Sequence, residues 1–341
     1  MDYLMNYDWT AWLDDPTKPL AVAGSELFTV NPRADSSPIG FFLNPSVVAV
    51  LVGLYFVSIP ALKWLCENYP MSEKEQEAAW TKLYDGIKAK RTKKLTAAST
   101  DGEKAKAKKS LDDLGDYAKF KKTAIKGFNG SASPAFKYFT ALHNVILIVF
   151  SGTVMLKATP VVFGWGQKHG FLAAYCDADK SMWSEGGFGY WATIFYLSKY
   201  YEFVDTWLIV CKVDSWTGKR AVPSLLQTYH HAGIALTMYG STVSQSAWIA
   251  WVVVMNSTVH TIMYTYFLAS TFGYRSPLAK YLTSMQLLQF LTGITMTCGV
   301  HYMGNACDSQ ASRYTLAGIQ IYAVGLVILF GSFYKKKYKK A

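Results

Sequence analysis

The stretch YFTALHNVILIVFSGTVMLKA, residues 138–158, decides which kind of protein this chain forms. It is almost wholly apolar, and its one charged side chain, Lys157, stands near its end. A helix rises about 1.5 Å per residue, so about 20 apolar residues cross the hydrocarbon core of a bilayer. The 341-residue chain is 51% hydrophobic and only 17% charged, which is unusual for a soluble domain. The stretch therefore predicts a membrane-spanning helix.

Six other stretches have the same character, at residues 42–65, 188–211, 222–241, 246–269, 282–301 and 315–334. The predicted fold class is an all-α multi-pass membrane protein with seven transmembrane helices. This prediction divides the chain into five segments. They are residues 1–41 before the first span, the first transmembrane helix at 42–65, a basic loop at 66–137, a six-helix membrane domain at 138–334 and a basic tail at 335–341.

Lysine and arginine collect on one side of these spans. That side holds the loop 66–137, the links KVDSWTGKR (212–220) and FGYRSPLAK (272–280), and the tail YKKKYKKA (334–341). Because positive loops stay in the cytosol, we expect a cytosolic C-terminus and a lumenal N-terminus. The net charge of +11 therefore indicates topology. The cations flank spans instead of forming one groove, which argues against nucleic-acid binding.

The loop 66–137 has a composition of its own. Between residues 71 and 130 it holds fifteen Lys or Arg and nine Asp or Glu. One interpretation is a solvated, partly helical cytosolic linker. The other is a helix that lies on anionic headgroups, since Trp80, Leu83, Tyr84 and Ile87 fall at helical spacing beside lysines. The sequence leaves both open.

Two of the five cysteines, Cys176 and Cys307, fall in loops on the lumenal side of this topology. The lumen of the secretory pathway is oxidising, so disulfides form and persist there. The sequence therefore predicts a disulfide between Cys176 and Cys307.

Polar and ionisable side chains inside spans are costly, so each one is a candidate functional residue. One alternative is that they make interhelical hydrogen bonds. Four clusters on consecutive spans favour a buried polar site. The clusters are Lys199, Glu202 and Asp205 in the third span, Gln227, His230 and His231 in the fourth, Asn256, His260 and Tyr264 in the fifth, and Gln286 and Gln289 in the sixth.

Three of these clusters stand in longer motifs: KYYEFVDT at 199–206, NSTVHTIMY at 256–264 and TSMQLLQF at 283–290. In this order they resemble the signatures of the fatty-acid elongase (ELO) family of the endoplasmic reticulum, over residues from about 135 to the end. The family's His-x-x-His-His box is matched in part, because residues 227–231 read QTYHH. This form of the box is similar to that of polyunsaturated-fatty-acid elongases of algae and protists.

The resemblance implies a 3-ketoacyl-CoA synthase whose seven helices enclose an acyl tunnel. Such an enzyme condenses acyl-CoA with malonyl-CoA to give 3-ketoacyl-CoA, CO2 and CoA, with no bound cofactor and no metal. The substrate implied by Gln227 is a polyunsaturated acyl-CoA, and a saturated or monounsaturated acyl-CoA is the alternative. The implied partners are membrane lipid and the reductases and dehydratase of the elongation cycle. The resemblance leaves open whether the protein forms a homo-oligomer.

Within that reaction the catalytic candidates are His230, His231 and His260. Imidazole attacks thioesters at neutral pH, so we expect His230 to carry the acyl group. His260 is expected to be its partner or to stabilise the malonyl-derived enolate. His231 points about 100° away on a helix and is expected to orient other groups, for example by bonding Asp205. Cys298 is the alternative nucleophile.

The remaining candidates bind substrate. Five of them are expected to donate hydrogen bonds to the enolate, thioester or carboxylate: Gln227, which cannot act as a base, and Asn256, Tyr264, Gln286 and Gln289. Lys199 has two interpretations, as the counter-charge of malonate or a CoA phosphate, and as the ion-pair partner of Glu202.

The residues present argue against two rival functions. A di-iron membrane desaturase needs more histidines than the six present, with one adjacent pair. A retinal protein needs a lysine in the last span, and 315–334 has none. A seven-helix receptor is not excluded by such a count, but the four enzyme-like motifs in order argue against it. The end of the sequence, KYKKA, carries Lys337 and Lys339 and resembles a cytosolic dilysine retrieval signal for the endoplasmic reticulum. A basic tail attracted to anionic lipid is the alternative.

Overall fold

The structure is a computed structural model that describes residues 38–274 and 277–338. Most of the expected N-terminal segment 1–41 and the residue Lys339 therefore lie outside the described residues. Within the described residues the regular structure is helical, and the one β feature is an isolated bridge between Val213 and Arg220. The expected all-α fold class is confirmed.

The helices follow one another along the chain with short links. They are α4 (Pro38–Phe42), α5 (Pro45–Glu67), α6 (Glu73–Thr96), α7 (Asp101–Asp112), α8 (Tyr117–Thr123), α9 (Pro134–His169), α10 (Phe171–Tyr175), α11 (Ser181–Ser184), α12 (Phe188–Tyr201), α13 (Phe203–Val210), α14 (Leu225–Val243), α15 (Ile249–Thr271), α16 (Ala279–Met303), the short 3-10 helix η1 (Gly304–Ala306) and α17 (Gln310–Tyr338).

Every stretch that the sequence assigns to a span contains helix, with one interruption. The third stretch, 188–211, is divided at Glu202, where α12 ends and α13 begins. Three helices, α5, α9 and α17, are long and apolar enough to cross a bilayer. Helices α12 to α16, which carry most of the polar candidate residues, fall short of that test. Seven spans therefore stay a prediction.

The described residues divide into two compact units. The first unit holds the described residues up to Val52, His143–Glu202, and the described residues from Tyr229 onward. The second unit holds Gly53–Leu142 and Phe203–Thr228. Long helices such as α5, α9 and α14 contribute residues to both, so this division does not follow the expected segments.

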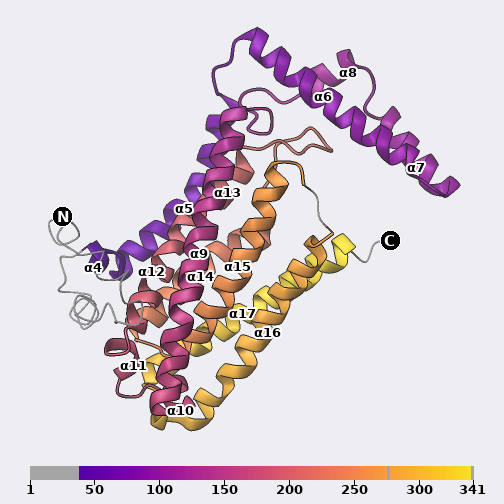
Figure 1. Ribbon diagram of the computed structural model, residues 1–341. Coiled ribbons are helices and arrows are strands. Elements are labelled where there is room, and N and C mark those ends of the chain that lie inside the picture. The colour runs from indigo at the N-terminus through magenta and orange to yellow at the C-terminus, as the bar shows by residue number, and fades with distance from the viewer. Residues whose placement is uncertain (1–37, 275–276, 339–341) are drawn as a thin grey trace. The chain divides into compact units, whose positions relative to one another are not determined.

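In the second unit the charged loop forms a helical subdomain. Helices α6 and α7 each begin with a capping box, at Ser72 and Thr100, and lie alongside each other (Figure 1). A small core holds them together, made of Leu83, Tyr84, Ile87, Leu114, Phe120 and Val213. The apolar stripe that favoured a headgroup-bound helix is therefore mostly used inside the protein.

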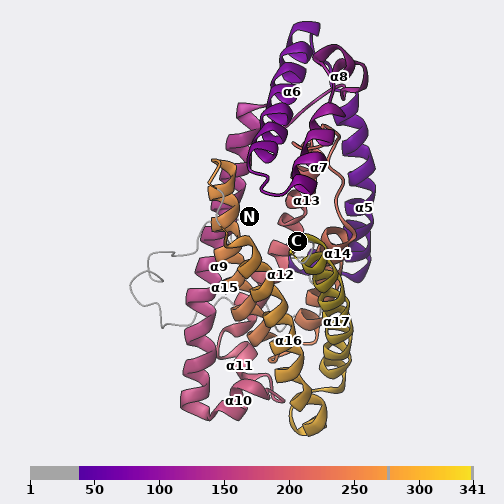
Figure 2. The same ribbon diagram turned by 90° about the vertical axis from the view of Figure 1, so that its right-hand side faces the viewer.

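In the first unit, helix α16 packs along α17 on one side and along α15 on the other, and α15 also meets α12 (Figure 2). At one end of these helices a disulfide joins Cys176 to Cys307, the pair that the sequence indicates. Beside it Lys180 pairs with the buried carboxylate of Asp308, which also accepts a hydrogen bond from Ser312. These bonds fix the loops that connect α10, α11 and α17.

Candidate active site

A buried ion pair lies where α12 ends. Lys199 Nζ is 2.6 Å from Glu202 Oε1, and their side chains are 1% and 2% exposed. The ammonium also lies 3.8 Å from the centre of the Phe195 ring, within the range of a cation–π contact. A buried charge needs a partner because desolvation costs several kcal/mol (order of magnitude) per ion. Of the two interpretations of Lys199, the ion pair with Glu202 is present in the structure.

Histidine and tyrosine rings of α14 and α15 lie next to this ion pair. Glu202 Oε1 is 3.9 Å from Nδ1 of His260. The His260 ring centre is 5.5 Å from that of Tyr264 and 6.5 Å from that of His230, and His230 is 5.3 Å from His231. The fold thus brings the three expected catalytic histidines together beside a carboxylate.

His230 has a further partner that sequence reasoning missed. Its Nδ1 lies 3.0 Å from the hydroxyl of Tyr322 on α17, and the same hydroxyl donates to the backbone oxygen of His230 at 2.9 Å. Tyrosine is common in spans, and Tyr322 stands 92 residues from His230 in an apolar stretch, so no local pattern indicates it. His143 is also buried, and its Nδ1 lies 3.2 Å from the Tyr201 hydroxyl.

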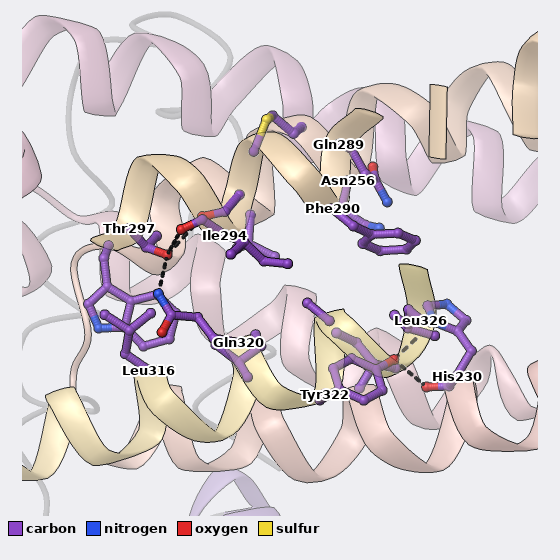
Figure 3. A pocket seen from close by; sticks show the side chains of 17 residues that line it. His230, Asn256, Gln289, Phe290, Ile294, Thr297, Leu316, Gln320, Tyr322 and Leu326 are labelled. Atoms are coloured by element: carbon purple, nitrogen blue, oxygen red, sulfur yellow. Dashed lines mark hydrogen bonds between the residues drawn. The ribbon is translucent and has the colours of Figure 1, made fainter. Parts of the chain in front are cut away.

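His230 lines a pocket in the first unit, and the space beside its lining residues is about 590 Å³ when the open solvent at its mouth is counted. In Figure 3, His230, Asn256 and Gln289 lie toward one end, and Thr297, Leu316 and Gln320 toward the other. Most of the other lining residues are apolar and come from α14 to α17 and from the residue before α15, namely Ile234, Trp248, Val252, Met255, Phe290, Gly293, Ile294, Ile319, Ala323 and Leu326.

Two polar atoms at the histidine end lack partners. Asn256 Oδ1 and Gln289 Oε1 are buried, and neither has a hydrogen bond within the described part of the chain. Buried polar atoms are nearly always paired, so these amides are available to a ligand. An amide can turn over and present its N–H groups instead, because its oxygen and nitrogen are assigned from the hydrogen-bond network.

The family of the chain follows from its sequence match over this region. Residues 117–341, well over half of the chain, match the model of the GNS1/SUR4 (ELO) family. The chain belongs to this family. Its members are membrane proteins, and the match includes every helix that contributes to the pocket.

Relatives within this family carry the name of one activity. The chain is 32% identical to "Fatty acid elongase sre1" of Dictyostelium discoideum over 209 residues, 60% of this chain and 73% of that protein. It is 35% identical to "Fatty acid elongase 1" of Trypanosoma brucei brucei over 173 residues, 50% of this chain and 54% of that protein. It is 29% identical to "Long chain fatty acid elongase 2" of Caenorhabditis elegans over 208 residues, 58% and 71% of the two chains. No solved structure gives a significant match.

Not all candidate residues from the family motifs lie at the pocket. Gln286 is turned toward Met263, with Nε2 3.3 Å from its sulfur. Asp205 and Gln227 belong to the second unit, where Gln227 lies 3.4 Å from the Thr206 hydroxyl, so a bond between Asp205 and His231 stays a prediction. Cys298 is exposed and is not among the residues that line the pocket.

Two further expectations concern metals and the tail. Within residues 38–274 and 277–338, no group of three or more His, Cys, Asp or Glu side chains is placed to hold a metal ion. Lys337 lies in the last turn of α17, with its ammonium 5.1 Å from the Phe333 ring centre.

Proposed function

We propose that this chain is a fatty acid elongase, a very-long-chain 3-oxoacyl-CoA synthase that condenses acyl-CoA with malonyl-CoA. The observation that carries the proposal is the pocket, whose lining is mostly apolar and which has a histidine and two amides with unpartnered oxygens at one end. An acyl chain is apolar along its length and reactive at one end. Membership of the GNS1/SUR4 family and the names of the relatives support the same activity.

The chemistry assigned to His230 is covalent transfer. A ring nitrogen attacks the thioester carbonyl, the carbon–sulfur bond breaks, and CoA leaves as a thiolate that takes up a proton. Malonyl-CoA then loses CO2, and the electron pair of the broken bond becomes an enolate. Its carbon attacks the acyl group on His230, so that a carbon–carbon bond forms, 3-ketoacyl-CoA is released and the histidine is regenerated.

The neighbouring side chains have supporting roles in this scheme. Asn256 and Gln289 offer N–H groups to the negative oxygen of the enolate or thioester, in a dry site where such dipoles act strongly. His260 stabilises the enolate, and Glu202 with Lys199 holds His260 in place. Tyr264, Gln286, Gln227 and Asp205 are proposed as further contacts of the substrates. No bound cofactor is needed for any step.

The proposed substrate is a polyunsaturated acyl-CoA. Support comes from the QTYHH form of the histidine box, which resembles that of elongases from algae and protists that act on such chains. The test is a competition among acyl-CoAs of equal length that differ only in their double bonds. Preference for the saturated or monounsaturated chain would favour the alternative substrate class.

The proposed location is the endoplasmic reticulum, with a lumenal N-terminus and a cytosolic C-terminus. The basic side of the predicted topology and the KYKKA end support it. A glycosylation acceptor added at the N-terminus should be glycosylated, and one added at the C-terminus should not. The reverse pattern would contradict the orientation. Replacing Lys337 and Lys339 by serine should move the protein to later compartments if they form a retrieval signal.

The activity is tested directly with purified protein in detergent. Acyl-CoA and malonyl-CoA labelled at its carboxyl group should give labelled CO2 and one 3-ketoacyl-CoA per CO2. His230→Ala should abolish both products, whereas His169→Ala, an exposed histidine stacked on Trp165, should not. Wild-type protein that binds iron and desaturates acyl chains, or that makes no product, would reject the elongase.

A further inference from the structure

The hydroxyl of Tyr322 makes two contacts with one residue, and the two contacts constrain its proton. It lies 2.9 Å from the backbone oxygen of His230 and 3.0 Å from Nδ1 of the same residue. A carbonyl oxygen can only accept a hydrogen bond, so the single hydroxyl proton is donated there. The hydroxyl can then meet Nδ1 only as an acceptor. Both hydrogen bonds therefore form together only if Nδ1 carries the ring proton.

A neutral imidazole carries one proton on its two nitrogens, so the position of that proton decides which nitrogen is nucleophilic. With the proton held at Nδ1 by Tyr322, the lone pair of His230 is at Nε2. His230 lines the pocket that the acyl chain is proposed to enter, so we expect Nε2 to attack a thioester bound there.

The position of Tyr322 is built by its surroundings. Gly233, one turn after His230, has no side chain, and a Cβ there would lie 2.2 Å from the Tyr322 ring. Tyr322 also stacks on Tyr229, with ring centres 5.3 Å apart. Tyr229 in turn requires Gly325, where a Cβ would lie 2.3 Å from its hydroxyl. Gly233 on α14 and Gly325 on α17 thus leave room for the rings of Tyr322 and Tyr229 to pack against each other. This packing holds the Tyr322 hydroxyl beside His230.

We propose that Tyr322 is a positioning residue that holds His230 in the Nδ1-protonated tautomer, so that Nε2 accepts the acyl group. The inference rests on the proposed function for its chemical consequence. Attack by Nε2 gives an acyl-imidazolium whose proton stays on Nδ1, where the Tyr322 hydroxyl continues to accept it. The hydrogen bond therefore persists from the resting histidine through the acylated state.

The tautomer can be read without any catalytic assay. Protein labelled with ¹⁵N in its histidine rings is placed in lipid bilayers, and the His230 signals are identified by their loss in His230→Ala. Nitrogen shifts in the wild type should show a protonated Nδ1 and an unprotonated Nε2. Tyr322→Phe should reduce this preference, whereas Tyr314→Phe, an exposed tyrosine on the same helix, should not. A wild-type His230 protonated at Nε2 would overturn the inference.

The kinetic consequence is a loss of turnover with little change in binding. Tyr322→Phe keeps the ring that fits against Gly233 and removes only the hydroxyl, so it should lower kcat by about 10- to 100-fold and leave the KM for acyl-CoA nearly unchanged. An unchanged kcat in a variant that has lost the tautomer preference would also overturn the role. Wild-type protein with the expected tautomer and no elongase activity would reject the proposed function and leave the tautomer assignment standing.

Discussion

Lys199 and Glu202 are two charges that the fold has removed from solvent together, and their coupling can be measured. Lys199→Met leaves Glu202 buried without its partner, which costs about 3–5 kcal/mol of stability. The double variant Lys199→Met/Glu202→Met removes both charges and should recover most of that loss. Unfolding in detergent micelles measures the three variants in a thermodynamic cycle.

The control for this cycle is Lys280→Met, because Lys280 is exposed and should change stability by no more than about 0.5 kcal/mol. Equal losses in Lys199→Met and in the double variant would mean that the two charges are not coupled. Lys199 would then have to act elsewhere, for instance as a counter-charge of the substrate.

Residues differ in how well their role can be predicted from sequence. His230, His260 and Asn256 stand out because polar side chains inside apolar stretches are costly and need a reason. Tyr322 carries no such signal, since its ring suits a span and its hydroxyl finds His230 only because Gly233 lets α17 approach. The partner of a residue depends on tertiary approach distances, which a local pattern does not contain.

At the scale of elements, helices α16 and α17 close the end of the pocket that lies away from His230. Gln320 Nε2 donates to the Thr297 hydroxyl at 3.0 Å and joins the two helices there (Figure 3). Gln289 and Thr297 are eight residues apart on α16, which corresponds to a rise of about 12 Å along the helix axis. An acyl chain that enters beside His230 would therefore reach this bridge after about 12 Å, and a longer chain has to bend or pass it.

The bridge should limit the length of the acyl chain. Gln320→Ala removes the longer of its two side chains and should shift the preferred acyl-CoA toward longer chains, whereas Ala323→Phe adds a large ring to the pocket lining and should shift it toward shorter ones. The measurement is the relative rate with a series of acyl-CoAs. Thr295→Ala, at an exposed position on α16, is the control. An unchanged length preference in both pocket variants would place the acyl chain elsewhere.

The helices themselves could be predicted because length and apolar composition are properties of a continuous stretch. The division at Glu202 could not, since it accompanies a buried ion pair within an otherwise apolar run. The loop 66–137 was ambiguous for a related reason. Its apolar stripe suits either a membrane surface or a small core, and only the position of Leu114, Phe120 and Val213 decides for the core.

At the scale of the whole molecule, the disulfide between Cys176 and Cys307 closes a long segment of chain, with a sequence separation of 131 residues. In the chain-entropy model such a loop contributes at most about 5 kcal/mol, and less if helices of the unfolded chain stay in the bilayer. Replacing both cysteines by serine should lower the thermal midpoint. Reductant should lower the midpoint of the wild type and leave that of the variant unchanged; equal midpoints for all samples would contradict a stabilising bridge.

Sequence reasoning reached this pair through topology, because both cysteines fall on the side of the spans that lacks cations. The division into two units has no such signal. It follows from which parts of α5, α9 and α14 meet which neighbours, and that depends on the packing of the whole chain.

The central claim is that His230 accepts the acyl group inside the pocket, and the most direct measurement omits the second substrate. Purified protein is mixed with acyl-CoA alone, free CoA is quantified, and the protein is analysed by intact and then peptide mass spectrometry. The account predicts one acyl group per chain on the peptide that contains His230, with one CoA released, and removal of the acyl group by malonyl-CoA. Product formation with malonyl-CoA in the absence of any adduct, or an adduct on another residue such as Cys298, would contradict it.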